Sequence, residues 1–447
     1  MKKFIYVALL ALGVLALVAP PAMAQEEKPF KIHGEVRVRG EYTANTTDFD
    51  KSGAVGDTTD FWPYRIRIAA EGSFAHNVSA WIEFQNADIG GGSGPVRTGF
   101  GLDTNGFGGG SQVELYQGNV TFNQIWSKNF SLRVGRQEIV AGNELLLGDL
   151  DFYAGQSHDG FVGSWNLKKV NVMVWATRPT QTNLVNLISA NGSPDNNAFS
   201  GGGNTGTQNF LGGYATWTWK KDQSFDVYLM DLDTKQVSNV ETVGVRWAHD
   251  VTTKDGFFWD AELAQQFGDA SYAASSKAKG RAFEGWFGYN FRSGKNVHRI
   301  YGRYEEATGD DTSAGSTDFQ GFIPMFGDFH NRTGHGDWFR LADASTNLGG
   351  GIGTGGLKAT SVSYTGYYSD KHEFGVAYWK YKLQKNNGPG SDDLGNAIDI
   401  WYGYNYSRNV TFTASLSQLS PGDGLTGGGA APNDNVTRLY GQARLRF

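Results

Sequence analysis

Cysteine is the most informative absence from this sequence, because the chain of 447 residues contains none. A chain without thiols forms no disulfide and holds no zinc–thiolate centre. It also offers no cysteine nucleophile and no attachment point for a c-type haem or a lipid anchor. We therefore expect no thiol chemistry, and nothing else in the sequence predicts a cofactor.

Long apolar runs are missing from most of the chain. The one candidate stands at the start, where Lys2 and Lys3 precede the apolar stretch 4–18 and the small-residue segment 22–24. This order is typical of a secretory signal peptide, so we expect residues 1–24 to be removed. A membrane anchor is the weaker alternative, since the apolar run is short, and no later run approaches the roughly 18 residues of a membrane helix.

Glycine and aromatic residues are abundant. The chain holds 62 glycines, 14% of its residues are aromatic, and its mean hydropathy is −0.41. A soluble domain rarely grows beyond roughly 250–300 residues around one core, whereas the wall of a large barrel is a single closed sheet. The composition therefore favours residues 25–447 as one outer-membrane barrel domain.

The last stretch, 436–447, alternates between apolar and polar residues. One face is the set Leu439, Gly441, Ala443, Leu445 and Phe447, and the other is the set Arg438, Tyr440, Gln442, Arg444 and Arg446. Successive side chains of a strand point to opposite faces, so one face suits lipid and the other water. With its terminal aromatic residue, the segment resembles the closing strand of bacterial outer-membrane barrels. It must pair with another strand, since lipid satisfies no backbone edge, and the first mature strand is the natural partner.

The same alternation recurs along the chain and predicts an antiparallel transmembrane β-barrel of about 18 strands. We expect the strands at 30–42, 62–74, 78–84, 113–126, 130–138, 158–167, 169–178, 210–220, 224–234, 240–249, 256–267, 281–291, 297–306, 359–368, 372–383, 396–406, 409–419 and 435–447. Short and long connections alternate between them. Outer-membrane barrels have short periplasmic turns and long external loops.

Arginines dominate the face that is predicted to meet water. The expected pore-lining residues on that face are Arg37, Arg39, Arg65, Arg67, Arg133, Arg299, Arg303, Arg438, Arg444 and Arg446, together with Glu83. They could form cross-strand ion pairs that stiffen the wall. They could also form an anion-favouring constriction, because rings of arginine select anions and guanidinium forks match carboxylates. Both interpretations hold if only some of the arginines are paired.

A motif in the first third of the chain resembles the signature of the alginate-export outer-membrane family. It comprises 132–138 (LRVGRQE), Gly142, 145–148 (LLLG) and 157–160 (SHDG). The resemblance implies a monomeric barrel with an arginine-rich, anion-selective pore, in a family whose named member exports a uronate polysaccharide. It also implies lumen or loop-anchoring roles for Arg133, Arg136, Glu138 and Asp159. Strict alternation would turn Arg136 outward into lipid, so we expect a bulge there or a position beyond the membrane.

The longest loop, 307–357, contains a glycine-rich segment at 327–337 with two histidines and two aspartates. Such residues could ligate a metal ion. We favour a loop that folds into the pore as a constriction or plug, and we expect no metal site.

The leading functional hypothesis is an outer-membrane porin for passive passage of anionic or sugar-like solutes, including an anionic polysaccharide such as alginate. Its expected partners are outer-membrane lipid, the solute and the barrel assembly machinery, with no nucleic acid and a monomeric state. A structural barrel in a secretion or electron-transfer complex is the alternative. An enzyme is disfavoured, because the adjacent Ser157, His158 and Asp159 cannot form a catalytic triad.

Overall fold

The structure is a computed structural model that describes residues 30–46, 48–53, 57–90, 113–180, 208–235, 237–251, 254–271, 276–311, 318–328, 330–339, 355–386, 390–426 and 433–447. The expected signal peptide at 1–24 and most of the connection 179–209 lie outside these residues. Within the described part, no helix is both long and apolar enough to cross a bilayer.

Eighteen long strands form the wall. They are β1 (Lys31–Ala44), β2 (Thr59–Phe74), β3 (Val78–Gly90), β4 (Glu114–Asn123), β5 (Phe130–Gln137), β6 (His158–Asn166), β7 (Val170–Pro179), β8 (Gln208–Lys220), β9 (Gln223–Thr234), β10 (Ser238–His249), β11 (Gly256–Ser271), β13 (Arg281–Ser293), β14 (Asn296–Ala307), β16 (Leu357–Tyr368), β17 (His372–Leu383), β18 (Asp393–Asn405), β19 (Val410–Pro421) and β20 (Val436–Arg446). Four short elements join them: η1 (Ala75–Asn77), β12 (Ser276–Ala278), β15 (Asp318–Phe319) and α2 (Asp423–Thr426).

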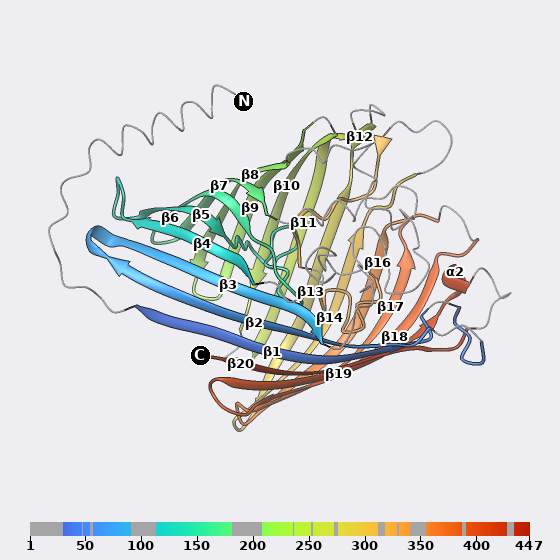
Figure 1. The fold of residues 1–447 in the computed structure, drawn as a ribbon. Coiled ribbons are helices and arrows are strands. Elements are labelled where there is room, and N and C mark those ends of the chain that lie inside the picture. The colour runs from blue at the N-terminus through green and yellow to red at the C-terminus, as the bar shows by residue number, and fades with distance from the viewer. Residues whose placement is uncertain are drawn as a thin grey trace.

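The wall closes on itself. Each long strand pairs antiparallel with its neighbours in the chain, and β20 pairs with β1. Figure 1 shows β1 and β20 side by side near the C-terminus. The predicted strand number, the antiparallel order and the pairing of the last strand with the first are confirmed. The two short strands β12 and β15, which pair in parallel above the wall, were not predicted.

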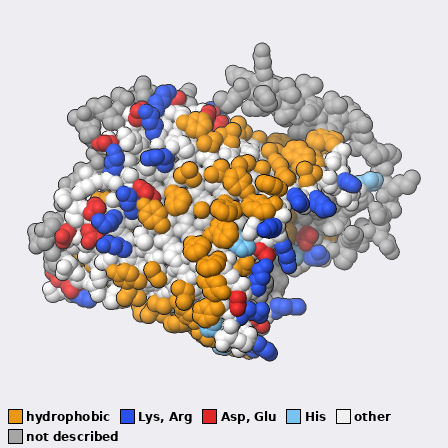
Figure 2. Space-filling view, turned by 180° about the vertical axis from the view of Figure 1, so that it is seen from behind, with side chains coloured by type: hydrophobic (Ala, Val, Ile, Leu, Met, Phe, Trp, Pro, Cys, Tyr) orange, Lys and Arg blue, Asp and Glu red, His pale blue; other side chains and the backbone are white. Residues whose placement is uncertain are grey.

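Side chains divide between the two faces as the alternation predicts. Apolar residues such as Ile68, Leu229 and Val362 are exposed on the outside, where Figure 2 shows a broad hydrophobic belt. Charged residues such as Arg65 and Glu284 point inward and are fully buried. Because lipid accepts apolar side chains and rejects charges, this division fits a membrane wall. The burial of the inward charges means that protein fills part of the lumen.

The seam between β1 and β20 ends at the terminal residue. The Gly34 amide donates to the Phe447 carbonyl (2.9 Å), and the Phe447 amide donates to the Gly34 carbonyl (3.0 Å). The Phe447 ring lies over Gly34, so a Cβ at position 34 would stand 2.4 Å from the ring. Only glycine leaves room for this contact, which covers the lipid side of the seam.

We predict that Gly34→Val displaces the Phe447 ring and destabilises the barrel by about 1–3 kcal/mol, as overpacking usually does. Gly441→Val is the matched control, because a Cβ at that position of β20 meets nothing within 4 Å. The temperature at which the folded barrel loses its heat-modifiable migration in a detergent gel measures the effect. Equal transition temperatures for the two variants would show that the ring contact contributes nothing.

Candidate functional site

Two long connections fold into the lumen and meet there. Loop A (138–157) joins β5 to β6, and loop B (320–339, of which 320–328 and 330–339 are described) precedes β16. The Phe326 amide donates to the Leu146 carbonyl (3.0 Å), and the Gly148 amide donates back to the Phe326 carbonyl (2.8 Å). The Asp328 amide donates to the Glu144 carbonyl (2.9 Å). These bonds join the two loops into one body, which we call the plug. The plug confirms the prediction that the longest loop enters the pore.

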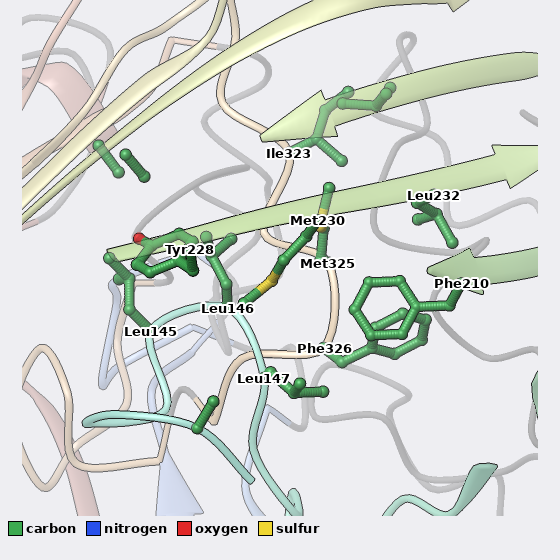
Figure 3. Close-up of a cluster of buried hydrophobic side chains, with 14 of the residues drawn as sticks. Leu145, Leu146, Leu147, Phe210, Tyr228, Met230, Leu232, Ile323, Met325 and Phe326 are labelled. Carbon is green, nitrogen blue, oxygen red and sulfur yellow. The ribbon is translucent and has the colours of Figure 1, made fainter. Parts of the chain in front are cut away.

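A hydrophobic cluster fixes the plug to one side of the wall, as Figure 3 shows. Loop A contributes Leu145, Leu146 and Leu147, loop B contributes Ile323, Met325 and Phe326, and the strands β8 and β9 contribute Phe210, Tyr228, Met230 and Leu232. Burying one such side chain stabilises a structure by about 1.5–3 kcal/mol. An apolar core inside the barrel therefore holds one edge of the plug against β8 and β9.

Arginines from β1 and β2 bind the other end of loop A. Arg37 donates to the main-chain carbonyls of Asp151 (2.6 Å) and Tyr153 (2.5 Å), and Arg39 donates to the carbonyl of Phe152 (2.5 Å). Arg65 pairs with the Asp151 carboxylate at 2.5 Å. Burial opposes ionisation of Asp151, but nearby guanidiniums, Arg65 foremost, outweigh it and hold the pKa of that carboxyl below its ordinary value.

Loop B is held by two further arginines. Arg438 of β20 binds the Asp337 carboxylate (2.7 Å) and also the Glu41 carboxylate of β1 (2.9 Å). Arg332 of loop B pairs with Glu284 of β13 and donates to a main-chain carbonyl of loop A. These pairs are buried, so removing one partner would leave an unpaired charge at high cost. The geometry of the plug is therefore fixed from several sides.

A cavity of about 310 Å³ remains between the plug and the wall formed by β1, β17, β18, β19 and β20. The wall presents Arg37, Arg39 and Arg444, and the plug presents Phe152, Asp328 and His330. We call this cavity the passage.

The passage combines cations with aromatic rings. Arg37 forms no ion pair among the described residues, because its bonds go to neutral carbonyls. Arg444, whose side chain is 20% exposed, pairs with Glu35 of β1. The ring of His330 stacks on Phe152 with centroids 3.3 Å apart, and His335 stacks on Trp401. Guanidinium groups bind carboxylates, and flat rings pack against sugar or other planar faces.

The predicted pore-lining arginines thus serve different purposes. All six arginines near the seam bind the plug or its partners, and Arg37, Arg39 and Arg444 also line the passage, whereas Arg65, Arg67 and Arg438 do not reach it. Three other arginines of the inner face form ion pairs: Arg303 with Glu284 and Glu305, Arg299 with Asp250, and Arg446 with Glu35. Two further predicted residues form hydrogen bonds with neutral side chains. Glu83 accepts one from Gln117, and Arg133 donates one to Gln137. The ion pairs of Arg299, Arg303 and Arg446 agree with the expectation that inner charges pair along the wall.

Arg136 and Asp159 do not belong to the lumen. They pair with each other (2.9 Å) on the outward-facing side of β5 and β6, near the ends of those strands that join the long loops. The neighbouring inward residues Gln137 and His158 are fully buried. The expectation that Arg136 and Asp159 line the pore is therefore corrected. Arg136 avoids the cost of lipid by standing close to the strand end with a carboxylate partner.

Three carboxylates meet where the two loops join. Oxygens of Glu144, Asp149 and Asp328 lie within 4.8 Å of one another, which makes them the group in the described residues with the spacing to hold a metal ion. Burial, and then the neighbouring carboxylates, raise the pKa of Glu144 to about 7 and that of Asp149 to about 6. Of the four residues singled out at 327–337, only Asp328 belongs to this group; His330 bonds to Asp337 instead (2.7 Å).

Several residues of the passage escaped the sequence analysis. Asp151 and Phe152 belong to a loop, where no periodicity shows which way a side chain points. Thr413 could have been found, because it lies on the inward-facing side of β19 opposite Gln442, which the alternation had placed on the polar face of β20. The segment 157–159 holds no catalytic arrangement, since His158 is buried against Phe210 and Phe326 while Asp159 faces outward.

Comparison with known proteins agrees with this architecture. The model of the family described as alginate export matches residues 110–437. No curated protein sequence matches the chain. Among solved structures, the chain is similar to OccK8 (OprE) of Pseudomonas aeruginosa, with 14% identity, 94% of this chain and 98% of that chain covered, and a TM-score of 0.62.

Two further structures show the same fold. OccK2 (OpdF) of Pseudomonas aeruginosa, solved in complex with glucuronate, has 13% identity, 94% and 98% coverage and a TM-score of 0.59. OccAB3 of Acinetobacter baumannii has 14% identity, 94% and 99% coverage and a TM-score of 0.62. The closed barrel with an inner plug defines a porin-like protein of the outer membrane. The family match over most of its length shows that the chain belongs to the alginate export family.

We predict that Phe326→Ala loosens the plug. Replacing a buried phenylalanine by alanine lowers the free energy of unfolding by about 3–5 kcal/mol. Here the weakened contact is the one between the plug and strands β8 and β9. Single-channel recordings in a planar bilayer should show a larger and noisier conductance. Phe291→Ala, on the outer face of β13, is the control and should conduct like the wild type. An unchanged Phe326→Ala conductance would mean that the cluster does not hold the plug.

We also predict that the contact between the loops weakens as the pH rises. The raised pKa values mean that neutral carboxyls favour the folded contact. The two neutral carboxyls stabilise the contact fully below their ordinary pKa of about 4, and this stabilisation is lost as the pH rises through 6 to 7. Amide hydrogen exchange of loop A, measured with EDTA present and corrected for intrinsic rates, should therefore be faster at about pH 8 than at about pH 5. Glu144→Gln with Asp149→Asn should remove the difference, and a pH-independent wild type would contradict the prediction.

Proposed function

We propose that the protein is an outer-membrane channel for small anionic solutes, with a preference for sugar acids, and that the solute moves through the passage beside the plug. The observation that carries the proposal is Arg37, a buried cation that lines the passage and has no carboxylate partner among the described residues. The Asp151 and Glu35 carboxylates attract Arg37, but both are bound by Arg65 and Arg444. A cation whose charge is incompletely compensated attracts anions into a pore.

The neighbouring groups support a solute that has both a carboxylate and a ring. Arg39 and Arg444 stand beside Arg37, and Trp401 and Tyr440 supply aromatic surface, whereas the Phe152 ring is covered by His330 and Arg39. A carboxylate would bind the guanidiniums while its ring packs on the aromatic side chains. A structure of the same fold was solved with glucuronate, which has both groups.

The charges opposite the arginines explain why the passage need not trap its solute. Asp151, Asp328 and Glu373 also line the cavity, so an anion meets repulsion as well as attraction there. Conduction requires binding that is strong enough for entry and weak enough for release. The volume of about 310 Å³ suits one monosaccharide unit at a time, whether as a free sugar acid or as part of an extended uronate chain such as alginate.

We further propose that the protein is a monomer, that the barrel assembly machinery inserts it, and that it acts without a cofactor and without catalysing a reaction. The pairing of β20 with β1 supports the monomer, because one chain completes the wall without a strand from a second copy.

We predict that Arg37→Gln lowers the ratio of chloride to potassium permeability by roughly twofold or more, because it removes an unpaired charge from the narrow part of the pore. The reversal potential under a potassium chloride gradient measures the ratio, and liposome swelling in glucuronate measures solute flux. Arg37→Lys should retain most of the selectivity because it keeps the charge.

Arg136→Gln is the matched control, since this arginine lies on the outer face and pairs with Asp159. It should leave selectivity and flux unchanged. A wild-type channel that prefers cations, or an Arg37→Gln variant with unchanged selectivity, would refute the role given to Arg37.

A further inference from the structure

The short-turn end of the barrel carries a ring of exposed cations, which we call the basic rim. Its members are Lys128, Lys169, Lys221, Lys295, Lys371 and Arg408. They come one each from the connections β4–β5, β6–β7, β8–β9, β13–β14, β16–β17 and β18–β19. Figure 2 shows basic side chains gathered along the lower right end of the molecule, beside the hydrophobic belt. The rim therefore runs around most of the barrel.

None of the six rim residues pairs with a carboxylate among the described residues. Two nearby aspartates already have partners, since Asp222 binds Lys254 (3.1 Å) and Asp250 binds Arg299 (3.4 Å). Asp255 and Asp370 are the other acidic residues of these connections. A ring of like charges repels itself unless an external anion compensates it.

Lysines at the opposite end of the barrel behave differently. Lys277 pairs with Asp269 (2.5 Å), Lys279 with Asp318 (2.6 Å), Lys382 with Asp392 (3.0 Å) and Lys385 with Asp311 (2.9 Å). Lys254 at the short-turn end is paired with Asp222 as well, so the uncompensated charge belongs to the six rim residues rather than to that whole end. The rim is therefore free to face anions that do not belong to the chain.

The rim lies just beyond an outer collar of aromatic rings. Trp126 stands two residues before Lys128, and Tyr406 stands two residues before Arg408. Both rings are more than 60% exposed on the outside of the barrel. Aromatic collars mark the level of the lipid headgroups, and each of these two rim cations lies in the same short turn as its ring. The rim cations therefore reach the depth of the headgroup phosphates.

From this placement we infer that the basic rim binds net-anionic phospholipid headgroups, such as phosphatidylglycerol, in the periplasmic leaflet. Two features favour lipid over an acidic soluble partner. Lipid surrounds a barrel on all sides as the rim does, whereas a docked protein covers one sector. The neighbouring aromatic collar also places the cations at the membrane surface.

Lipid competition tests the inference. The full-length barrel is reconstituted in phosphatidylcholine vesicles, and tryptophan quenching is compared for brominated phosphatidylglycerol and brominated phosphatidylcholine. Phosphatidylglycerol should bind at least about fivefold more tightly, the ratio expected for one lysine at an anionic surface. Changing all six rim residues to Gln should bring the ratio close to one. Changing Lys277, Lys279, Lys382 and Lys385 to Gln should leave the wild-type ratio.

Salt provides a test that needs no variant. The preference of the wild type should fall at about 1 M NaCl, where the screening length is about 3 Å, and millimolar inorganic phosphate should not displace the lipid. Equal quenching by the two lipids, an equal loss of preference in the long-loop control, or displacement by free phosphate would overturn the inference. The result is independent of the proposed solute, because the Arg37 experiments measure conduction and this one measures lipid contact.

Discussion

The need to pair every backbone amide in lipid governs this protein. Hydrocarbon offers no hydrogen bonds, so a sheet in the membrane must have no free edge. The antiparallel wall meets this condition by pairing its last strand with its first. Closure turns one face of every strand toward lipid and the other toward the lumen. The charged residues lie on the lumen face, where water or the plug can contact them. The character of the lumen follows from that separation.

Filling the lumen on one side creates the passage on the other. Apolar residues of loops A and B pack on β8 and β9, while arginines of β1, β2 and β20 bind the far edge of the plug. The plug is therefore anchored at both edges and leaves an opening along β17 to β20. The arginine-rich seam has two uses at once, because Arg65 and Arg438 stabilise the plug and Arg37 and Arg444 line the opening.

The wall could be predicted from the sequence, and the plug could not. Alternation along a strand decides which side chains point inward, so the positions of Arg37, Arg65 and Arg444 follow from residue parity alone. The same rule placed Arg136 outward, and the structure agrees with the rule rather than with the role that the family resemblance implied. Loop A has no such period. Its contacts depend on residues more than a hundred positions away, as in the bond from Arg37 to Asp151.

The contact of Phe447 with Gly34 joins two points that almost the whole chain separates. The sequence separation of this contact is therefore nearly the largest that the chain allows. The chain loses the entropy of closing so long a loop before the pairing of the two strands stabilises the barrel. The barrel cannot close before β20 has been made, since β20 supplies the edge that pairs with β1. Until then each growing sheet has an open edge that can pair with other chains. A polypeptide of this design must be kept from aggregating until its two ends meet.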